Sequence, residues 1–170
     1  DLRGTILTVW NNKGGVGKTT IAQSLAILLS EKISFGKKEK NKILLIDFDH
    51  NQGDLTANCK MERSEGETKK LLDDDYQNNL SNEGIINSLK SFTNIPKKGR
   101  KPRFPFDIKV LRADSALSRA SISYMKNFDA KDRLPLRKLS LNLSKSFDYI
   151  IIDAPPNYEQ SIFSQEAVSA

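Results

Sequence analysis

Three short apolar runs divide the chain and predict its buried strands. They cover residues 5–10, residues 42–47 and residues 149–153, and isoleucine, leucine and valine dominate them. The second and third runs are almost continuously apolar, and each ends in an aspartate, Asp47 and Asp153. Continuous apolar runs are typical of strands that helices cover on both faces. Each of these runs therefore predicts a strand in the interior of a layered fold.

Helical periodicity fills the segments between these runs. Apolar residues recur every three or four positions over residues 18–32, which predicts an amphipathic helix. Its apolar stripe consists of Ile21, Ala22, Leu25, Ala26, Leu28 and Leu29. A further strand is expected over residues 106–111 and a helix over residues 115–127. The apolar face of a last helix consists of Leu136, Leu139, Leu143 and Phe147.

The alternation of strands and helices predicts an α/β fold, with a mostly parallel β-sheet and helices on both faces. The length suits one α/β unit, so residues 1–170 are expected to form a single domain or the N-terminal part of one. The chain starts without methionine and ends in a helical-looking stretch, which favours an incomplete domain. Ligands of such sheets bind at the carboxyl ends of the strands.

A polar segment at about residues 61–105 interrupts the alternation and is expected to form a charged surface insertion with short helices. It contains an acidic run at residues 73–75 and a basic run at residues 97–103. Three successive acids point in different directions, so an exposed charged stretch is favoured over a metal site. For the basic run, a solvated loop is favoured over a contact with phosphates.

The composition narrows the class of protein. The net charge of +6 and the pI near 9.4 would suit a polyanionic partner such as nucleic acid, without establishing one. A single cysteine, Cys59, excludes an internal disulfide and cannot supply a metal cluster alone, which favours a reducing cytoplasm. No apolar run approaches the roughly 20 residues that cross a bilayer, so a soluble protein is expected.

A glycine-rich turn between the first strand and the first helix carries the chemistry. It consists of Lys13, Gly14, Gly15, Val16, Gly17, Lys18, Thr19 and Thr20. Glycines let successive N–H groups point inward, and the helix N-terminus adds partial positive charge, so the turn suits phosphate oxygens. Lys18 is expected to neutralise the terminal phosphates, and the Thr19 hydroxyl to ligate Mg²⁺. The turn therefore predicts a nucleoside triphosphate and Mg²⁺ as cofactors.

This turn resembles the deviant Walker A motif of the ParA/MinD family of P-loop ATPases. The standard phosphate loop has glycine where this sequence has Asn12, and Lys13 stands at the position of the family's extra lysine. Asn11 and residues 149–156 also resemble this family, most closely its ParA, or Soj-like, partition ATPases. The resemblance implies ATP as the nucleotide and a sandwich homodimer that forms on ATP binding. It also implies that Lys13 reaches the partner's nucleotide and acts with Lys18 in catalysis.

The acids at the strand ends match further parts of the family pattern. Asp47 and Asp49 resemble switch I, which implies that Asp49 positions the attacking water and that Asp47 supports Mg²⁺ through water. Asp153, followed by Ala-Pro-Pro, resembles a Walker B acid at switch II, which implies that it holds a magnesium-bound water. Solvated strand ends are the alternative interpretation of these acids. His50 and Asn51 make the segment one residue longer than the family pattern, and His50 is expected to be a loop side chain.

The resemblance implies a Mg²⁺-dependent, cytoplasmic and nucleoid-associated ParA-type ATPase that positions plasmid, chromosome or another cargo. Its dimer is expected to bind DNA without sequence preference, largely through residues outside this chain, and a ParB-like or adaptor protein to stimulate hydrolysis. One alternative is a MinD-like membrane ATPase, whose C-terminal amphipathic basic helix does not occur before Ala170. Another is a non-hydrolysing scaffold that binds ATP only to dimerise. An iron-protein type of cluster carrier is set aside, because Cys59 does not follow the third strand.

Overall fold

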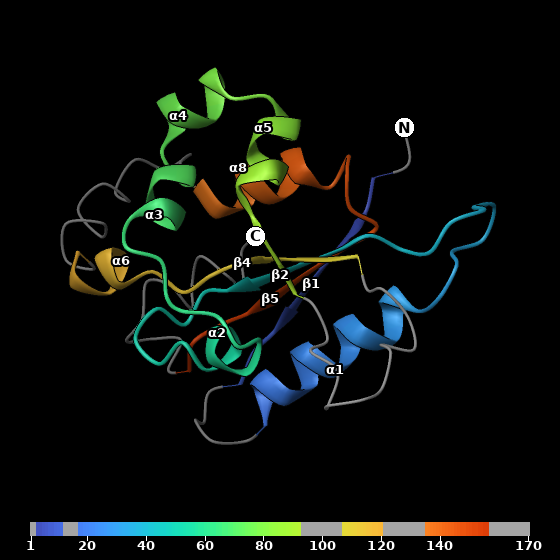
Figure 1. The fold of residues 1–170 in the computed structure, drawn as a ribbon, viewed down its shortest axis with the longest axis horizontal. Helices are drawn as coiled ribbons and strands as arrows, with labels where there is room; N and C mark the ends of the chain where they lie inside the picture. Colours follow the sequence, from blue (N-terminus) through green and yellow to red (C-terminus); the bar gives the residue numbers. More distant parts are fainter. Residues whose placement is uncertain (1–2, 12–16, 93–106, 121–134, 157–170) are drawn as a thin grey trace, which may run out of the picture.

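The computed structural model describes residues 3–11, 17–92, 107–120 and 135–156, and its strands form one five-stranded sheet in the order β1-β5-β2-β4-β3. The strands are β1 (Thr5–Val9), β2 (Ile43–Asp47), β3 (Lys90–Phe92), β4 (Ile108–Leu111) and β5 (Tyr149–Asp153). Neighbouring strands run parallel except at one edge, where β3 pairs antiparallel with β4. The predicted α/β fold with a mostly parallel sheet is confirmed (Figure 1).

The register of the sheet aligns the carboxyl ends of three strands. β5 lies between β1 and β2, and its last residue, Asp153, pairs with Val9 on one side and with Asp47 on the other. The third apolar run of the sequence is therefore the central strand of this part of the sheet. Its terminal acid lies between the turn that follows β1 and the acid that ends β2.

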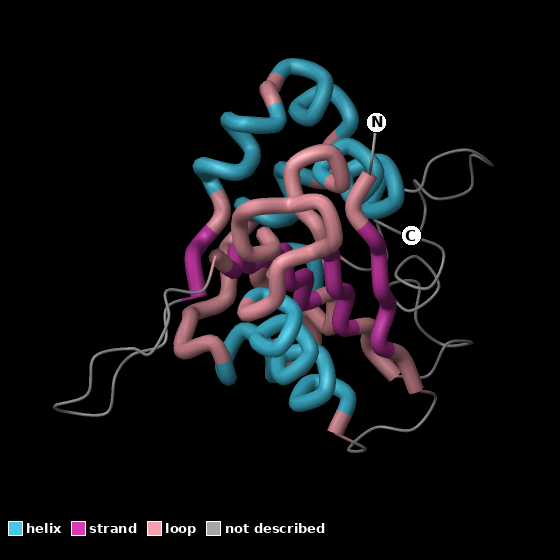
Figure 2. Tube along the Cα trace, turned by 90° about the vertical axis from the view of Figure 1, so that its right-hand side faces the viewer, coloured by secondary structure: helices cyan, strands magenta, loops and turns pink. Residues whose placement is uncertain are grey.

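Helices cover both faces of the sheet, as Figures 1 and 2 show. On one face lie α1 (Lys18–Ser30) and α2 (Asp54–Asn58). The helices on the other face are α3 (Glu67–Leu71), α4 (Asp74–Asn79), α5 (Asn82–Ser88) and α8 (Pro135–Leu143). A short helix after β4, α6 (Ser115–Arg119), adds Leu117 to the core of that second face.

Strand side chains alternate between two hydrophobic cores. In β2, Leu44 and Ile46 pack in the core of the second face, whereas Ile43 and Leu45 pack in the core beneath α1. Every residue of β2 is buried. Because successive strand side chains point to opposite faces, a strand with two covered faces is apolar at every position. This geometry accounts for the continuous apolar runs of the sequence.

The polar segment after residue 61 forms the short helices that its sequence predicts, but it is not confined to the surface. α3, α4 and α5 come from it, and so does the edge strand β3, which was not predicted. Leu71, Leu72, Ile85 and Leu89 are buried in the core of the second face. Isolated apolar residues in a polar sequence show no period, so their burial depends on contacts distant in the chain. The basic run at residues 97–103 lies outside the described residues.

The acidic run begins with a helix cap. Asp73 is exposed, and its carboxylate accepts a hydrogen bond from the Tyr76 N–H at 2.9 Å, which caps the N-terminus of α4. Asp75 is exposed as well. Their surface position agrees with the predicted charged stretch.

Two predicted helices differ in detail from the structure. In α1 the buried residues are Ala22, Ala26 and Ser30, whereas Ile21 and Leu28 are 56% and 57% exposed, so the predicted stripe is wrong at these two positions. Alanine at the contact lets the helix backbone approach the sheet closely, which turns the larger side chains outward. α6 covers only the beginning of the predicted helix at residues 115–127, and residues 121–127 lie outside the described part. None of the helices described is both long and apolar enough to cross a membrane.

Gly4 lies where the backbone entering β1 touches the backbone entering β5. Its N–H donates to the Ser144 carbonyl at 2.7 Å, and a Cβ added at Gly4 would lie 1.9 Å from the Phe147 carbonyl oxygen. Because backbone cannot yield as a side chain does, we expect Gly4→Ala to lower the free energy of unfolding by roughly 1–3 kcal/mol or more. Urea denaturation followed by circular dichroism measures this loss.

The matched control for this prediction is Gly84→Ala in α5. A Cβ at Gly84 would meet only side-chain atoms, at 3.2 Å for Leu80 and 3.3 Å for Ser81, so little change is expected. Equal unfolding midpoints for Gly4→Ala and the unmodified chain would contradict the close backbone contact.

Candidate nucleotide-binding site

Within the predicted phosphate loop, the structure describes Gly17 and the residues after it, where the loop enters α1. Gly17 has φ +81° and ψ +15°, in the left-handed region that glycine adopts without steric cost. No side chain caps this end of the 13-residue helix. Uncapped N–H groups and the positive end of the helix dipole together favour an anion. Asn12, Lys13, Gly14, Gly15 and Val16 lie outside the described residues, so their roles stay predictions.

Asp153 connects the end of β5 to the first turn of α1. The Thr19 hydroxyl donates to Asp153 Oδ2 at 2.8 Å, and Lys18 Nζ lies 3.6 Å from Asp153 Oδ1. The Asp153 side chain is 1% exposed and that of Lys18 is 11% exposed. The fold thus brings together the predicted phosphate-binding lysine, the predicted magnesium ligand and the predicted Walker B acid. Thr20 is exposed beside them in the same turn.

One carboxylate oxygen of Asp153 can accept a further bond. Asp153 Oδ1 is buried and has no hydrogen-bond partner among the described residues, since the Lys18 ammonium lies at ion-pair distance only. Burial raises the pKa of Asp153, although the Thr19 hydroxyl and the Lys18 ammonium both act to lower it. A further cation, or a water polarised by a cation, would stabilise this carboxylate in its charged form.

Asp47 is buried at the end of β2 and is held by Thr56. The backbone N–H and the hydroxyl of Thr56 donate to Asp47 Oδ2 at 2.9 and 2.6 Å, and the Asp49 N–H donates to Oδ1 at 3.2 Å. The Thr56 hydroxyl in turn accepts from the Ala113 N–H at 2.9 Å. Burial raises the pKa of Asp47 to about 7; the carboxylates of Asp153 and Asp49 also raise it, and the bonds from Thr56 lower it.

Asp49 lies two residues further on, in the turn between β2 and α2. Its carboxylate accepts from the Gln52 N–H at 3.2 Å, and its carbonyl accepts from the Gly53 N–H at 2.8 Å. Burial raises the pKa of Asp49, whereas the Gln52 N–H and the Lys18 ammonium lower it. Asp47 is 0% exposed and Asp49 is 8% exposed, so the interpretation of these acids as solvated strand ends is wrong.

Arg63, which the sequence interpretation did not include, holds the turn after Asp49. Its guanidinium donates to the carbonyl oxygens of His50 at 2.7 Å, Asn51 at 2.7 Å and Gln52 at 2.5 Å. A rigid fork with five donors suits several convergent carbonyls. In the sequence, the only indication of an unusual turn was its extra residue. Nothing in the pattern near Asp49 indicated that an arginine beyond α2 would bind this turn.

His50 is a second anchor of this turn. Its ring is fully buried, its Nδ1 accepts from the Asp114 N–H at 3.0 Å, and it packs edge-on against Phe48 with ring centroids 4.6 Å apart. Burial lowers the pKa of His50 to about 3, so the imidazole is neutral at physiological pH. His50 lies in a loop, as expected, but its ring is part of the protein interior, which the sequence did not indicate.

The oxygen donors of the site suit a Mg²⁺ ion whose other ligands are phosphate oxygens and water. The Asp47 and Asp153 carboxylates and the Thr19 hydroxyl are hard oxygen donors, which Mg²⁺ prefers. No three His, Cys, Asp or Glu side chains within the described ranges gather closely enough to hold a metal alone. Mg²⁺ in nucleotide sites commonly has one or two protein ligands and otherwise binds phosphates and water. The donor set agrees with that arrangement, and so does Asp153 Oδ1, which has no hydrogen-bond partner among the described residues.

The chain is similar to known proteins over nearly its whole length. The model of the AAA domain family matches residues 4–169. The sporulation initiation inhibitor protein Soj of Bacillus subtilis is 29% identical over 156 residues, and the alignment covers 91% of this chain and 51% of that protein. The chromosome-partitioning ATPase Soj of Treponema pallidum is 32% identical over 155 residues, which cover 91% of this chain and 49% of that protein.

A solved structure shows the same fold. The complex of a variant of Cyanothece McdA with ATP matches with a TM-score of 0.69 and 24% identity, over 100% of this chain and 54% of that one. At this level of identity the likeness concerns the fold alone. The chain spans about half the length of the curated relatives it matches.

The raised pKa of Asp47 predicts a pH-dependent difference between the unmodified chain and Asp47→Asn. A folded pKa of about 7 against 3.8 in the unfolded chain means that protonated Asp47 stabilises the fold below pH 4. That contribution is lost as pH rises through 7. We therefore expect the difference in free energy of unfolding, Asp47→Asn minus the unmodified chain, to rise by at most about 4 kcal/mol between pH 4 and pH 8.

Urea denaturation of both proteins at several pH values, without nucleotide, measures this difference. The shift of His50, which acts in the opposite direction below pH 6.5, is present in both proteins and cancels. Asp75→Asn, at an exposed position, is the matched control and should show no such trend. A constant difference across the pH range would show that Asp47 is charged in the folded protein.

Proposed function

The chain belongs to the AAA domain family, and we propose that it is a P-loop ATPase of the ParA/MinD type that hydrolyses ATP with Mg²⁺ as part of a partition ATPase. One observation carries this proposal: Asp153, at the end of a central strand, contacts both Lys18 and Thr19 in the first turn of α1. A phosphate-binding turn beside a strand-end carboxylate is the arrangement by which P-loop enzymes support phosphoryl transfer.

Lys18 and Thr19 have distinct roles in this proposal. The Lys18 ammonium would bind the β- and γ-phosphates, and the Thr19 hydroxyl and Asp153 would hold the metal and its water. Mg²⁺ held by these residues would supply positive charge that stabilises the phosphates during transfer. The contacts of Asp153 with both side chains support these roles.

Asp49 is the residue proposed to position the attacking water. Its carboxylate is buried, and the Lys18 ammonium, which lies 3.6 Å from Asp153 Oδ1, also lowers the pKa of Asp49. Phosphoryl transfer depends mainly on positioning and electrostatics, and a fixed carboxylate can orient a water and accept its proton late. Arg63 and Gln52 fix the turn that carries this carboxylate.

Lys13 is proposed to complete the site of a second subunit. Its match to the extra lysine of the deviant Walker A motif supports a sandwich dimer with two ATP molecules between the subunits. A second cation on the phosphates would stabilise the transition state and make hydrolysis depend on dimerisation. Two proteins named Soj are among the similar proteins, and one of them is named a chromosome-partitioning ATPase.

The cellular role proposed is the segregation or positioning of plasmid, chromosome or another cargo. The ATP-bound dimer binds DNA without sequence preference, largely through residues outside this chain, in the cytoplasm at the nucleoid. A ParB-like or adaptor protein stimulates hydrolysis. The basic composition of the chain, with a net charge of +6, is compatible with a polyanionic partner.

ATP turnover tests the assignment of Lys13 and Asp49. We expect Lys13→Ala and Asp49→Ala each to lower the turnover rate at least about 100-fold, because each removes a group that acts in the transition state. Asp49→Ala should still bind ATP, which a fluorescent ATP analogue measures. Lys32→Ala and Asp75→Ala, at exposed positions away from the site, are the charge-matched controls. Turnover of Lys13→Ala at the unmodified rate would exclude the sandwich mechanism.

Retention on DNA tests the partition role with the full-length protein. We expect duplex DNA to be retained with ATP and not with ADP, and the affinity to fall steeply with salt, because phosphate contacts release counterions. Lys13→Ala, which should not form the dimer, is the negative control. If the full-length protein does not bind DNA but sediments with anionic liposomes only in the presence of ATP, the MinD-like alternative is favoured.

A further inference from the structure

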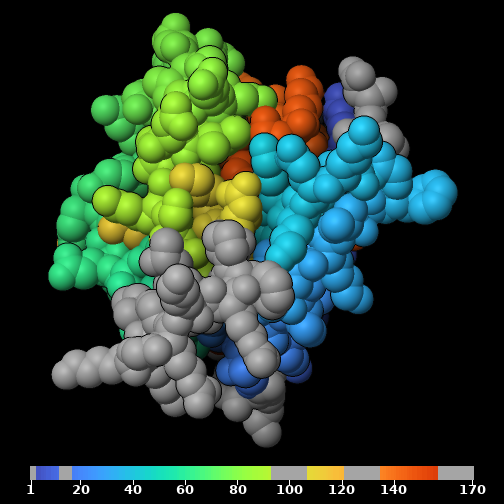
Figure 3. All heavy atoms as spheres, turned by 45° about the vertical axis from the view of Figure 1, so that its right-hand side comes forward, coloured from blue at the N-terminus to red at the C-terminus, as the bar shows by residue number. Residues whose placement is uncertain are grey.

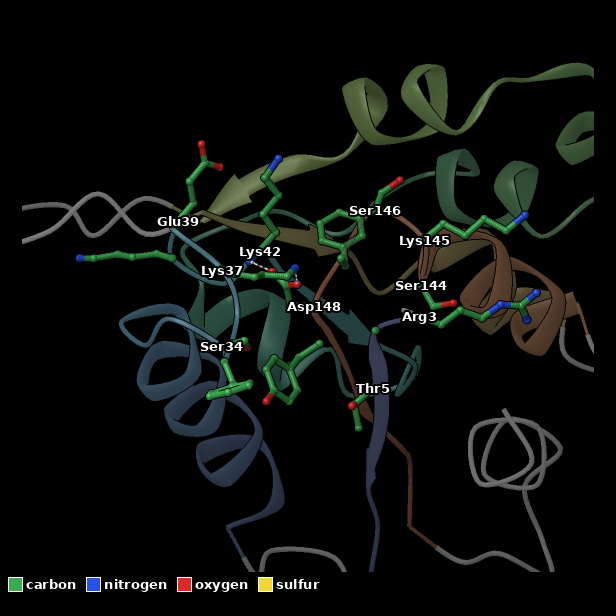
Figure 4. A pocket seen from close by; sticks show the side chains of 15 residues that line it. Arg3, Thr5, Ser34, Lys37, Glu39, Lys42, Ser144, Lys145, Ser146 and Asp148 are labelled. Atoms are coloured by element: carbon green, nitrogen blue, oxygen red, sulfur yellow. Dashed lines mark hydrogen bonds and ion pairs between the residues drawn. The ribbon is translucent and has the colours of Figure 1, made fainter. Parts of the chain in front are cut away.

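A basic cleft lies at the end of the sheet opposite the nucleotide site. It has a volume of about 380 Å³ and is bounded by the segments that enter β1, β2 and β5 (Figure 4). Thr5 and Tyr149, the first residues of β1 and β5, line it, whereas the last residues of the same strands lie at the nucleotide site. A five-residue strand separates the two ends by about 13 Å. The cleft is therefore a separate site.

Cations on three segments surround this cleft. The lining cations are Arg3, Lys37, Lys40, Lys42 and Lys145, and the lining acids are Glu39 and Asp148. Asp148 is already engaged, since its carboxylate pairs with the Lys37 ammonium and accepts from the Lys42 N–H at 2.8 Å. Five cations against two acids leave an excess of three positive charges. This excess favours an anionic ligand.

The walls of the cleft are held by hydrogen bonds. Buried Asn41 donates through its side chain to the Leu29 carbonyl at 3.0 Å and accepts from the Ser34 hydroxyl at 2.6 Å, which fixes the loop between α1 and β2. On the other wall, the Gly4 N–H donates to the Ser144 carbonyl at 2.7 Å. A cleft with fixed walls binds a ligand without first having to be ordered.

The cations lie along the rim rather than around one point. In Figure 4, Arg3 and Lys145 extend on one side of the cleft, and Lys37 and Lys42 lie on the other. A distributed set of cations suits a chain of anions better than a single small anion. It also suits a linear polyanion better than a flat bilayer, because a flat surface cannot contact both walls of a cleft.

Phe35 adds an aromatic surface to the same rim. Its side chain is fully exposed in the loop that precedes β2, and it lines the cleft. That loop projects from the body of the molecule in Figures 1 and 3. An exposed phenylalanine next to lysines is typical of sites where an unpaired base stacks on a ring while its phosphates meet cations. In a duplex the base faces are already stacked and are closed to such a ring.

We propose that this cleft binds a single nucleic-acid strand without sequence preference, with its phosphodiester backbone along the rim cations and a base stacked on Phe35. The contact requires neither ATP nor a second subunit, and it is distinct from the duplex binding proposed for the ATP-bound dimer. It therefore goes beyond the proposed function and can fail independently of it.

Fluorescence anisotropy with labelled oligo(dT), measured on the full chain without nucleotide at several salt concentrations, tests the proposal. Phe35→Ala should weaken binding roughly five- to 150-fold, whereas Phe35→Trp should retain it. Lys42→Gln together with Lys145→Gln should lower the slope of log affinity against log salt by about 1.4, which is about 0.7 for each lost phosphate contact. The same oligonucleotide in duplex form should bind more weakly.

The matched control is Lys69→Gln together with Lys90→Gln, which removes two exposed charges away from the cleft and should leave the slope unchanged. Binding of a fluorescent ATP analogue should be the same in all variants, which separates this test from the nucleotide site. Equal salt slopes in both double variants, or equal binding of duplex and single strand, would overturn the proposal. Capture by phosphatidylserine vesicles through Phe35 without any binding of oligo(dT) would also overturn it.

Discussion

The contact between Asp153 and the first turn of α1 depends on the order of strands in the sheet. Because β5 pairs with β1 on one side and β2 on the other, its terminal carboxylate lies where the turn after β1 enters the helix. Thr19 and Lys18 are successive helix residues, and both reach that carboxylate. A different strand next to β1 would leave Lys18 and Thr19 without this acid. The chemistry of the site is thus a consequence of topology.

The same arrangement creates an electrostatic imbalance. Asp47, Asp49 and Asp153 are all buried, and burial raises the pKa of each. Lys18 lowers the pKa of Asp49 and Asp153, and Arg63 also lowers the pKa of Asp49, but both pKa values stay above the ordinary value. Three buried carboxylates outnumber these two cations, which is costly in an apolar interior. Added positive charge would lower that cost, which gives the site an intrinsic preference for a cation.

Much of the fold could be predicted from the sequence, because its central strands are covered on both faces. β2 and β5 correspond to apolar runs of the sequence, and the glycine-rich turn and the terminal acids predicted the candidate site. β3 could not be predicted, since Lys90, Ser91 and Phe92 show no strand pattern and pair only through β4. The exposure of Ile21 and Leu28 could not be predicted either, because periodicity identifies an apolar stripe but not the part of it that contacts the sheet.

The largest gap in the sequence interpretation concerns the segment after Asp49. Arg63 closes the turn from the polar segment, and Asp114, after β4, accepts from the N–H groups of Gly66 and Lys69 while its own N–H donates to His50. Three stretches distant in the chain therefore meet around one turn. If Asp49 moved, the hydrogen bonds between its turn and these stretches would have to break, or the stretches would have to move with it. The segment that local composition marks as a surface insertion is thus part of the frame that fixes the candidate water-positioning carboxylate.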